Sequence, residues 1–176
     1  MRASLTELAA LMTERASADV TAAALAVPAE RLAWKPSDPV RSTVMSQLFE
    51  CAVVNTLWAE VVANRGIGKD IMPPAYLDLR DAQAAGKLDT LVPMLAALEQ
   101  STLALASAIR ALPEDETGTV VPVWDGTMPL SECCFYAYWH LAYHEGQINY
   151  LQTLYGDQAN HHAYHMNTDA EQSAGG

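Results

Sequence analysis

The sequence predicts an all-α fold in which a single domain forms a four-helix bundle. Four long segments repeat apolar side chains in steps of three and four residues, which places these side chains on one face of a helix. Proline or glycine follows each segment and marks its end. The chain has 176 residues, of which 51% are hydrophobic, so it is long and apolar enough to bury one substantial core.

The first two predicted helices have clear boundaries. The first spans residues 4–26 and ends before Pro28. The second spans residues 42–65, with Ser42 as its N-cap and Gly66 as its C-terminal stop. Six side chains of the second helix follow heptad spacing: Val44, Leu48, Cys51, Asn55, Trp58 and Val62.

The last two predicted helices each carry a seam typical of bundles. The third spans residues 89–112, with Asp89 as its cap and Pro113 after its end. The fourth spans residues 130–155 and ends at Gly156. The seam of the third helix is Leu91, Leu95, Leu98, Thr102, Leu105, Ile109 and Leu112, and that of the fourth is Cys133, Ala137, His140, His144, Gln147, Leu151 and Leu154.

The connections complete the predicted architecture. Between the second and third helices, residues 66–87 are too many for a tight turn and predict a crossover along the bundle, with a short helix near 76–83. Strand-forming residues around Asp125–Gly126 predict a small hairpin before the fourth helix. We expect one domain over residues 1–156 and a polar, flexible tail over 157–176.

Charge and composition exclude several classes of function. The net charge is −11, from 10 basic against 21 acidic residues, which predicts repulsion from nucleic acids and from anionic membranes. The N-terminal segment lacks the apolar core of a signal peptide, and no apolar run is long enough for a transmembrane helix. Three cysteines, two of them adjacent, do not resemble a disulfide framework, so we expect a reducing cytoplasm.

Two histidines on one apolar stripe are the strongest chemical signal. His140 and His144 are four residues apart, so both project from one face of the fourth predicted helix. A metal ion would satisfy one nitrogen of each ring, and this spacing is one by which a helix offers two imidazoles to one metal. The alternative is a pair of hydrogen-bonded core histidines. Gln147, one turn further, is placed to orient a ligand or a water molecule.

A metal site needs a third ligand, and the second predicted helix offers Glu50. Its carboxylate lies one turn before Val54 on an apolar face, where burial without a partner would be costly. Solvation at the edge of the bundle is the alternative. Cys51 is the other candidate, but it points about 100° away, so we expect only one of the two to reach the histidines.

Other polar residues give weaker signals. Glu145 follows the second histidine directly, so the pattern is not that of a zinc protease, and Glu145 is expected to point away into solvent. His161, His162 and His165 lie in a segment without an apolar face, which predicts a flexible tail. No Glu-x-x-His sequence exists for a ferritin-like di-iron site. Trp124 on the predicted hairpin is a candidate to overhang the mouth of the site.

Two stretches resemble the DinB-like (DNA-damage-inducible) family of four-helix bundles. "WHLAYHEGQINYLQTLYGD" resembles the family's H-x-x-x-H-x-x-Q segment, which closes with a glycine, and "LAWKPSDPVRSTVMSQLFE" resembles its W-x-P…S segment. The resemblance covers residues 4–156 and implies a divalent metal, often zinc or nickel, held by three histidines. His140 and His144 match two of them, whereas Glu50 stands where the third is expected. A carboxylate favours harder ions such as iron or manganese, without excluding zinc.

Two classes of function stay open, the first implied by the resemblance and the second favoured by Glu50 in place of the third histidine and by apolar positions on the second helix beyond one stripe. One is a metal-dependent enzyme, either a hydrolase or a thiol-dependent transferase, that acts on a small-molecule substrate or a thiol. The other is a non-enzymatic bundle that binds a small molecule or forms a homodimer. The sequence names neither a substrate nor a reaction.

Overall fold

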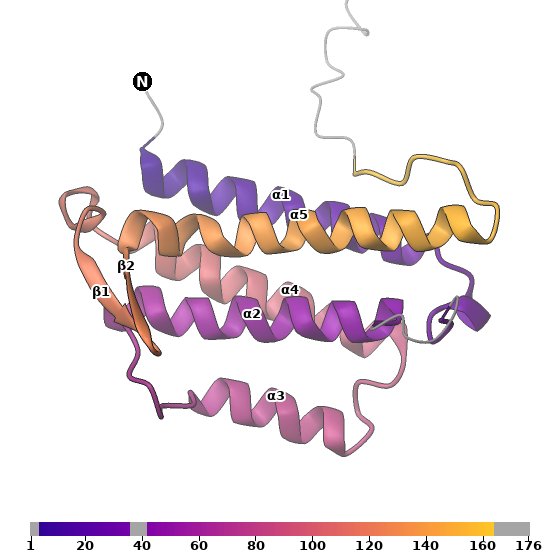
Figure 1. Cartoon of the computed structure of the whole chain (residues 1–176), viewed down its shortest axis with the longest axis horizontal. Coiled ribbons are helices and arrows are strands. Elements are labelled where there is room, and N and C mark those ends of the chain that lie inside the picture. The colour runs from indigo at the N-terminus through magenta and orange to yellow at the C-terminus, as the bar shows by residue number, and fades with distance from the viewer. Residues whose placement is uncertain (1–3, 36–41, 164–176) are drawn as a thin grey trace, which may run out of the picture.

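The computed structural model describes residues 4–35 and 42–163, and it is built mainly of helices (Figure 1). Five α-helices and one antiparallel sheet of two strands occur within these residues: α1 (Leu5–Leu25), α2 (Val44–Asn64), α3 (Pro74–Ala84), α4 (Leu91–Arg110), β1 (Val120–Val123), β2 (Gly126–Pro129) and α5 (Leu130–Leu154). The all-α class and the hairpin are as predicted, but the count of four helices is not exact. The fifth helix is α3, which extends the short helix predicted in the crossover.

The four long helices form a ring of neighbours in which α2 packs against α4 and α5, and α1 packs against the same two helices. The end of α2 reaches the hairpin, because the Ile67 amide donates a hydrogen bond to the Pro122 carbonyl at 2.8 Å. Since α4 also ends beside the hairpin, α2 and α4 run in the same direction (Figure 1). Helix α3 runs in the opposite direction and leads the chain from the end of α2 back to the start of α4. The crossover prediction is therefore confirmed.

The helix ends differ slightly from the predicted caps. The N-cap of α2 is Thr43 and not Ser42, because Thr43 and Ser46 exchange hydrogen bonds in a capping box. The N-cap of α4 is Thr90 and not Asp89, and its side chain makes no capping hydrogen bond. The shift at α2 arises because two adjacent polar residues can cap the same unpaired amides.

Gly66 ends α2 for a physical reason. Its φ of +123° is a conformation that other residues rarely adopt, and it follows Arg65 in the left-handed region at φ 58°. A Cβ atom at Gly66 would lie 2.8 Å from the Pro122 side chain. The close approach of the chain to β1 therefore requires glycine here.

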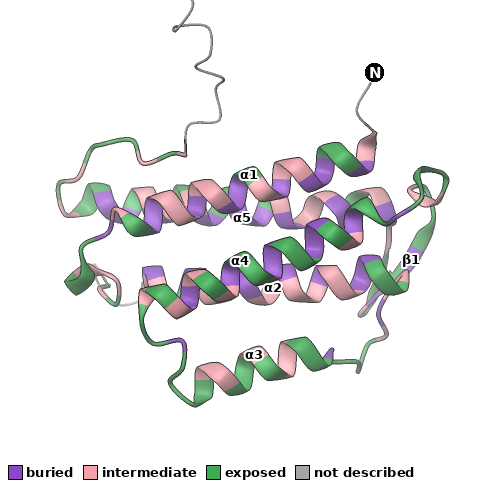
Figure 2. Cartoon of the chain, turned by 180° about the vertical axis from the view of Figure 1, so that it is seen from behind, coloured by how far each residue is buried: buried purple, intermediate pink, exposed green. Residues whose placement is uncertain are grey.

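The core is divided into two apolar clusters by a layer of polar side chains. Buried positions occur along the whole length of the long helices (Figure 2). Buried residues toward the hairpin form one cluster, and those toward the opposite end form the other. Between them, Thr102 Oγ1 on α4 lies 2.9 Å from Ser17 Oγ on α1 and accepts a hydrogen bond of 2.9 Å from Asn55 Nδ2 on α2. His140 occupies the same height on α5, between Ala137 of one cluster and Leu141 of the other. We call Ser17, Asn55, Thr102 and His140 the polar layer.

Within the described residues, one helix passes a length-and-composition test for a membrane span. This helix is α4, whose most apolar 18-residue window has a mean hydropathy of 1.3. It packs against α1 and α2 as a core helix of the bundle, and core helices of globular domains pass the same test.

Candidate metal centre

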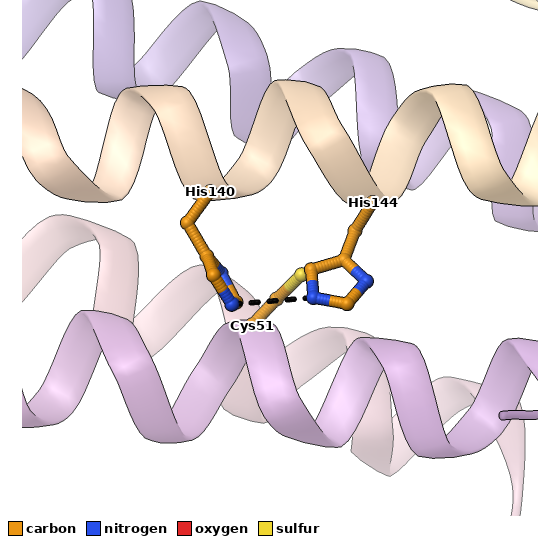
Figure 3. Close-up of side chains that lie close together, drawn as sticks. All are labelled: Cys51, His140 and His144. Carbon is orange, nitrogen blue, oxygen red and sulfur yellow. Dashed lines mark hydrogen bonds between the residues drawn. The ribbon is translucent and has the colours of Figure 1, made fainter. Parts of the chain in front are cut away.

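Helix α5 brings His140 and His144 together as predicted. Both side chains point from α5 toward α2 (Figure 3), and only 7% of His140 and 3% of His144 are exposed. Their Nε2 atoms lie 3.2 Å apart. The spacing of four residues therefore places two imidazole nitrogens around one point inside the bundle.

Helix α2 contributes both of its candidate ligands. The Sγ atom of Cys51 and one ring nitrogen of each histidine all lie within 4.8 Å of one another, and all three residues are buried. Glu50 Oε1 lies 3.7 Å from Nε2 of His140 and of His144, although 55% of the Glu50 side chain is exposed. The expectation that only one of them reaches the site is wrong. The long Glu50 side chain extends to the histidines from the surface, whereas the short Cys51 side chain points directly inward.

Gln47 is a site residue that the sequence analysis missed. It is 2% exposed, and its Oε1 accepts a hydrogen bond from Nδ1–H of His144 at 3.2 Å. This bond fixes the tautomer in which the lone pair of His144 Nε2 faces His140. The sequence feature that indicates this role is the position of Gln47, one turn before Cys51 on the same face of α2. Gln147, which was predicted, lies near the His144 ring and partly opposes the lowering of the pKa that burial causes in that imidazole.

The electrostatics of the site favour neutral imidazoles. Burial is the main cause that lowers the pKa of both histidines, and for His140 the neighbouring His144 lowers it further. The Glu50 carboxylate opposes both shifts. Neutral imidazole is the form that binds a metal. Burial also raises the pKa of the Cys51 thiol strongly, and the charge of Glu50 adds to this. The thiol is therefore protonated unless a cation lies beside it.

The donor atoms fit a transition metal. In a tetrahedral zinc site, bonds of about 2.0–2.1 Å to imidazole place two nitrogens about 3.4 Å apart, close to the 3.2 Å that separates the two Nε2 atoms. Two imidazoles and a thiol form a donor set that suits zinc and nickel better than manganese. The two histidines differ in how their second ring nitrogen is held. Nδ1 of His140 is buried and has no hydrogen-bond partner among the described residues.

Aromatic side chains line the surface beside the centre. Trp139 and Tyr143 stack with their ring centroids 6.0 Å apart, and the Tyr143 ring lies 5.3 Å from that of His144. Trp124 was considered as a cover for the mouth of the site, but it packs edge-on against Trp58 at 5.7 Å. The hairpin that carries Trp124 lies against the C-terminal end of α2, where the Trp124 amide donates a hydrogen bond to the Ile67 carbonyl at 3.2 Å.

The tail histidines lie beside carboxylates and form no metal cluster within the part of the chain that the structure describes. His161 lies 2.9 Å from Asp157, and His162 lies 2.8 Å from Glu145. The expectation of a solvated Glu145 is wrong, since only 15% of its side chain is exposed. The reason is that the segment after α5 returns to the helix. His165 and the rest of the tail lie outside the described residues, so the division at residue 156 stays a prediction.

Comparison with known proteins places the chain in a family. The family model for the DinB superfamily matches residues 12–148, which include α2, α3, α4 and most of α5. Neither the search of curated proteins nor the search of solved structures found a match. Members of the matched superfamily bind metals, and the buried Cys51, His140 and His144 form a possible metal site here. The chain belongs to the DinB superfamily.

Proposed function

We propose that the protein is a metal-dependent enzyme that acts on a small molecule. The observation that carries this proposal is the convergence of Cys51 Sγ and two imidazole nitrogens from facing helices, each atom within 4.8 Å of the others. Bundle cores hold metal sites built from side chains on facing helices, and three protein ligands with one open position are typical of a catalytic zinc ion. The reaction is a hydrolysis or a transfer to a thiol.

Cys51, His140 and His144 would hold a divalent transition metal. Zinc or nickel suits the thiol and the imidazoles, whereas ligation by Glu50 in place of Cys51 would favour iron or manganese. Three protein ligands leave a coordination position for a reactant. When bound, the cation would supply Lewis acidity, which lowers the pKa of a water molecule or a thiol toward neutrality.

The remaining residues have roles that follow from their positions. Glu50 lies between the buried donors and solvent, so its carboxylate can accept the proton of an approaching water molecule or thiol. Gln47 holds His144 in one tautomer, and Gln147 restrains the same ring. Trp139 and Tyr143 are 60% and 53% exposed and offer an apolar wall to a substrate beside the site.

Metal analysis tests this proposal directly. Protein purified without a histidine tag or a nickel column is expected to contain about one equivalent of a transition metal, or to take up one equivalent on titration. The measurement is elemental analysis by mass spectrometry, followed by calorimetric titration with zinc and with nickel. Less than about a tenth of an equivalent, with no binding on titration, would contradict the proposal.

Substitutions of Cys51 and Glu50 distinguish the residue that binds the metal from the residue that accepts a proton. Cys51→Ser is expected to weaken zinc binding about 100-fold, because it removes a buried ligand. Glu50→Gln keeps the shape of the side chain and is expected to change zinc affinity by less than about tenfold while it abolishes activity. Competition titration with a chromophoric chelator measures both affinities. The opposite order would make Glu50 the third ligand.

A second candidate is a bundle that binds a small molecule or forms a homodimer without catalysis. It is favoured by Leu25, Val92 and Leu103, which are 62%, 80% and 57% exposed and border a hollow of about 640 Å³ between α1 and α4. If this face joins two copies, Leu103→Glu is expected to halve the mass measured by light scattering at high protein concentration. A monomer at all concentrations would exclude the dimer.

The state of the cysteines agrees with a cytoplasmic location, which we propose. Cys51, Cys133 and Cys134 are all free and buried. Burial raises the pKa of Cys133 to about 11 and is the main cause that raises that of Cys134 to about 12. The thiols of Cys133 and Cys134 therefore stay protonated and unreactive, as expected of a protein that carries no structural disulfide.

A further inference from the structure

A cavity of about 480 Å³ lies under the crossover helix α3, where α3 faces α2 and α4. None of the eleven residues of α3 is buried, so this helix stands off the bundle beside the two long helices (Figure 2). Six alanines contribute to the cavity wall from the three helices, and their small side chains leave the space open. Its volume is in the range of small-molecule sites.

The cavity is separate from the candidate metal centre. On α2 it is lined by Thr56, Ala59 and Glu60. Glu60 follows Cys51 by nine residues, which at about 100° per residue turns it to the opposite side of the helix. The histidines belong to α5, whereas the other walls of the cavity come from α3, α4 and the loop that joins them. A ligand in this cavity would therefore not touch the metal ligands.

The two hydroxyl groups that line the cavity have no hydrogen to offer a ligand. Thr56 Oγ1 donates to the Ala52 carbonyl at 2.8 Å, and Ser101 Oγ donates to the Leu98 carbonyl at 2.9 Å. Each oxygen therefore presents only lone pairs to the cavity. Both hydroxyls act there as hydrogen-bond acceptors.

The charged groups of the lining are acceptors too. Glu60 and Asp78 contribute carboxylates from α2 and α3, and no lysine, arginine or histidine occurs among the described residues that line the cavity. Glu60 Oε2 accepts a hydrogen bond from Asn64 at 2.9 Å, which leaves Oε1 available. Gln100 is the one lining side chain that can donate. The cavity therefore combines an apolar wall with acceptors and negative charge.

We propose that this cavity binds a small organic cation in which an ammonium group is attached to an apolar body. The ammonium group supplies the hydrogen-bond donors that the carboxylates and hydroxyls lack, and a positive charge opposite Glu60 and Asp78. The apolar body covers the alanines and Leu79. The net charge of −11 favours the approach of cations over that of anions.

Three probes that share a phenyl ring test the proposal on the full-length protein. Phenethylammonium is expected to bind with one site in calorimetric titration. The neutral 2-phenylethanol is expected to bind at least about tenfold more weakly, which corresponds to a difference of about 1.4 kcal/mol. The anion 3-phenylpropanoate is expected not to bind. Equal affinity for the ammonium and the alcohol, or no binding of phenethylammonium, would overturn the proposal.

Variants locate the site. Glu60→Gln with Asp78→Asn is expected to weaken phenethylammonium binding about tenfold or more. Ala104→Phe, a change at an exposed lining position, is expected to block it. Asp81→Asn is the matched control, since Asp81 lies on the same helix outside the cavity and pairs with Arg80. Unfolding curves check that each variant folds. Equal affinity in the double variant and in Asp81→Asn would place the ligand elsewhere and overturn the proposal.

Discussion

Replacing His144 by alanine is expected to lower the bound metal from about one equivalent to less than about a tenth. His144 supplies one of three converging donors, is 3% exposed, and is held by Gln47. Two remaining ligands hold a metal weakly, and no other donor atom moves into the space that the imidazole leaves. Elemental analysis after dialysis against a zinc buffer measures the loss. The rise in Tm that saturating zinc gives the parent protein should disappear as well.

His161→Ala is the matched control for this experiment. His161 pairs with Asp157 outside α5 and lies in no metal-capable cluster of the described residues. Its removal should leave both the metal content and the response of Tm to zinc unchanged. If His144→Ala retained a full equivalent of zinc, the ion would lie elsewhere and the centre between α2 and α5 would be wrong.

Leu98→Ala is expected to lower the free energy of unfolding by about 2–5 kcal/mol, the largest stability effect that we predict. Leu98 is fully buried on α4 in the cluster that also contains Leu48 on α2 and Val20 on α1. Truncation removes apolar contacts and leaves a cavity that the rigid helices only partly close. For a chain of this size, the corresponding fall in Tm is about 4–20 °C. Urea unfolding followed by circular dichroism gives the free energy.

Leu8→Ala is the control with the same chemical change. Leu8 lies on α1 and is 46% exposed, so its truncation leaves no cavity inside the protein. The substitution is therefore expected to lower the free energy of unfolding by less than about 1 kcal/mol. A loss at Leu98 no larger than that at Leu8 would show that the helices repack around the missing side chain, and would contradict the packing described for this cluster.

Most of the fold could be predicted because its signals are local. Apolar spacing located the long helices, and the prolines and glycines after them located their ends, as Gly66 shows at the end of α2. The length of the connection predicted the crossover and a short helix within it. The caps were less certain, because Ser42 and Thr43 are both good N-caps, and only the hydrogen bonds to Ser46 decide between them.

The candidate site could be predicted only in part, because its details depend on how α2 is rotated against α5. The spacing of four between His140 and His144 was enough to place both on one face. The helical step fixes the angle between Glu50 and Cys51, but side-chain length lets both approach the histidines. Gln47 could not be predicted as the hydrogen-bond partner of His144, because the sequence does not show which ring nitrogen a buried glutamine faces. The pairing of Glu145 with His162 depends on the path of the chain after α5.

The polar layer has a consequence for the alignment of the helices along their axes. The two apolar clusters on either side of it consist mainly of aliphatic side chains, whose contacts are less directional than hydrogen bonds and would resist a sliding of α4 past α2 only weakly. Such a shift would separate Thr102 from Asn55 and Ser17 and leave several polar groups buried without partners. The layer therefore selects one axial register among several of similar apolar burial. It does so at some expense in stability, since Asn55 Oδ1 has no partner among the described residues even in the native alignment.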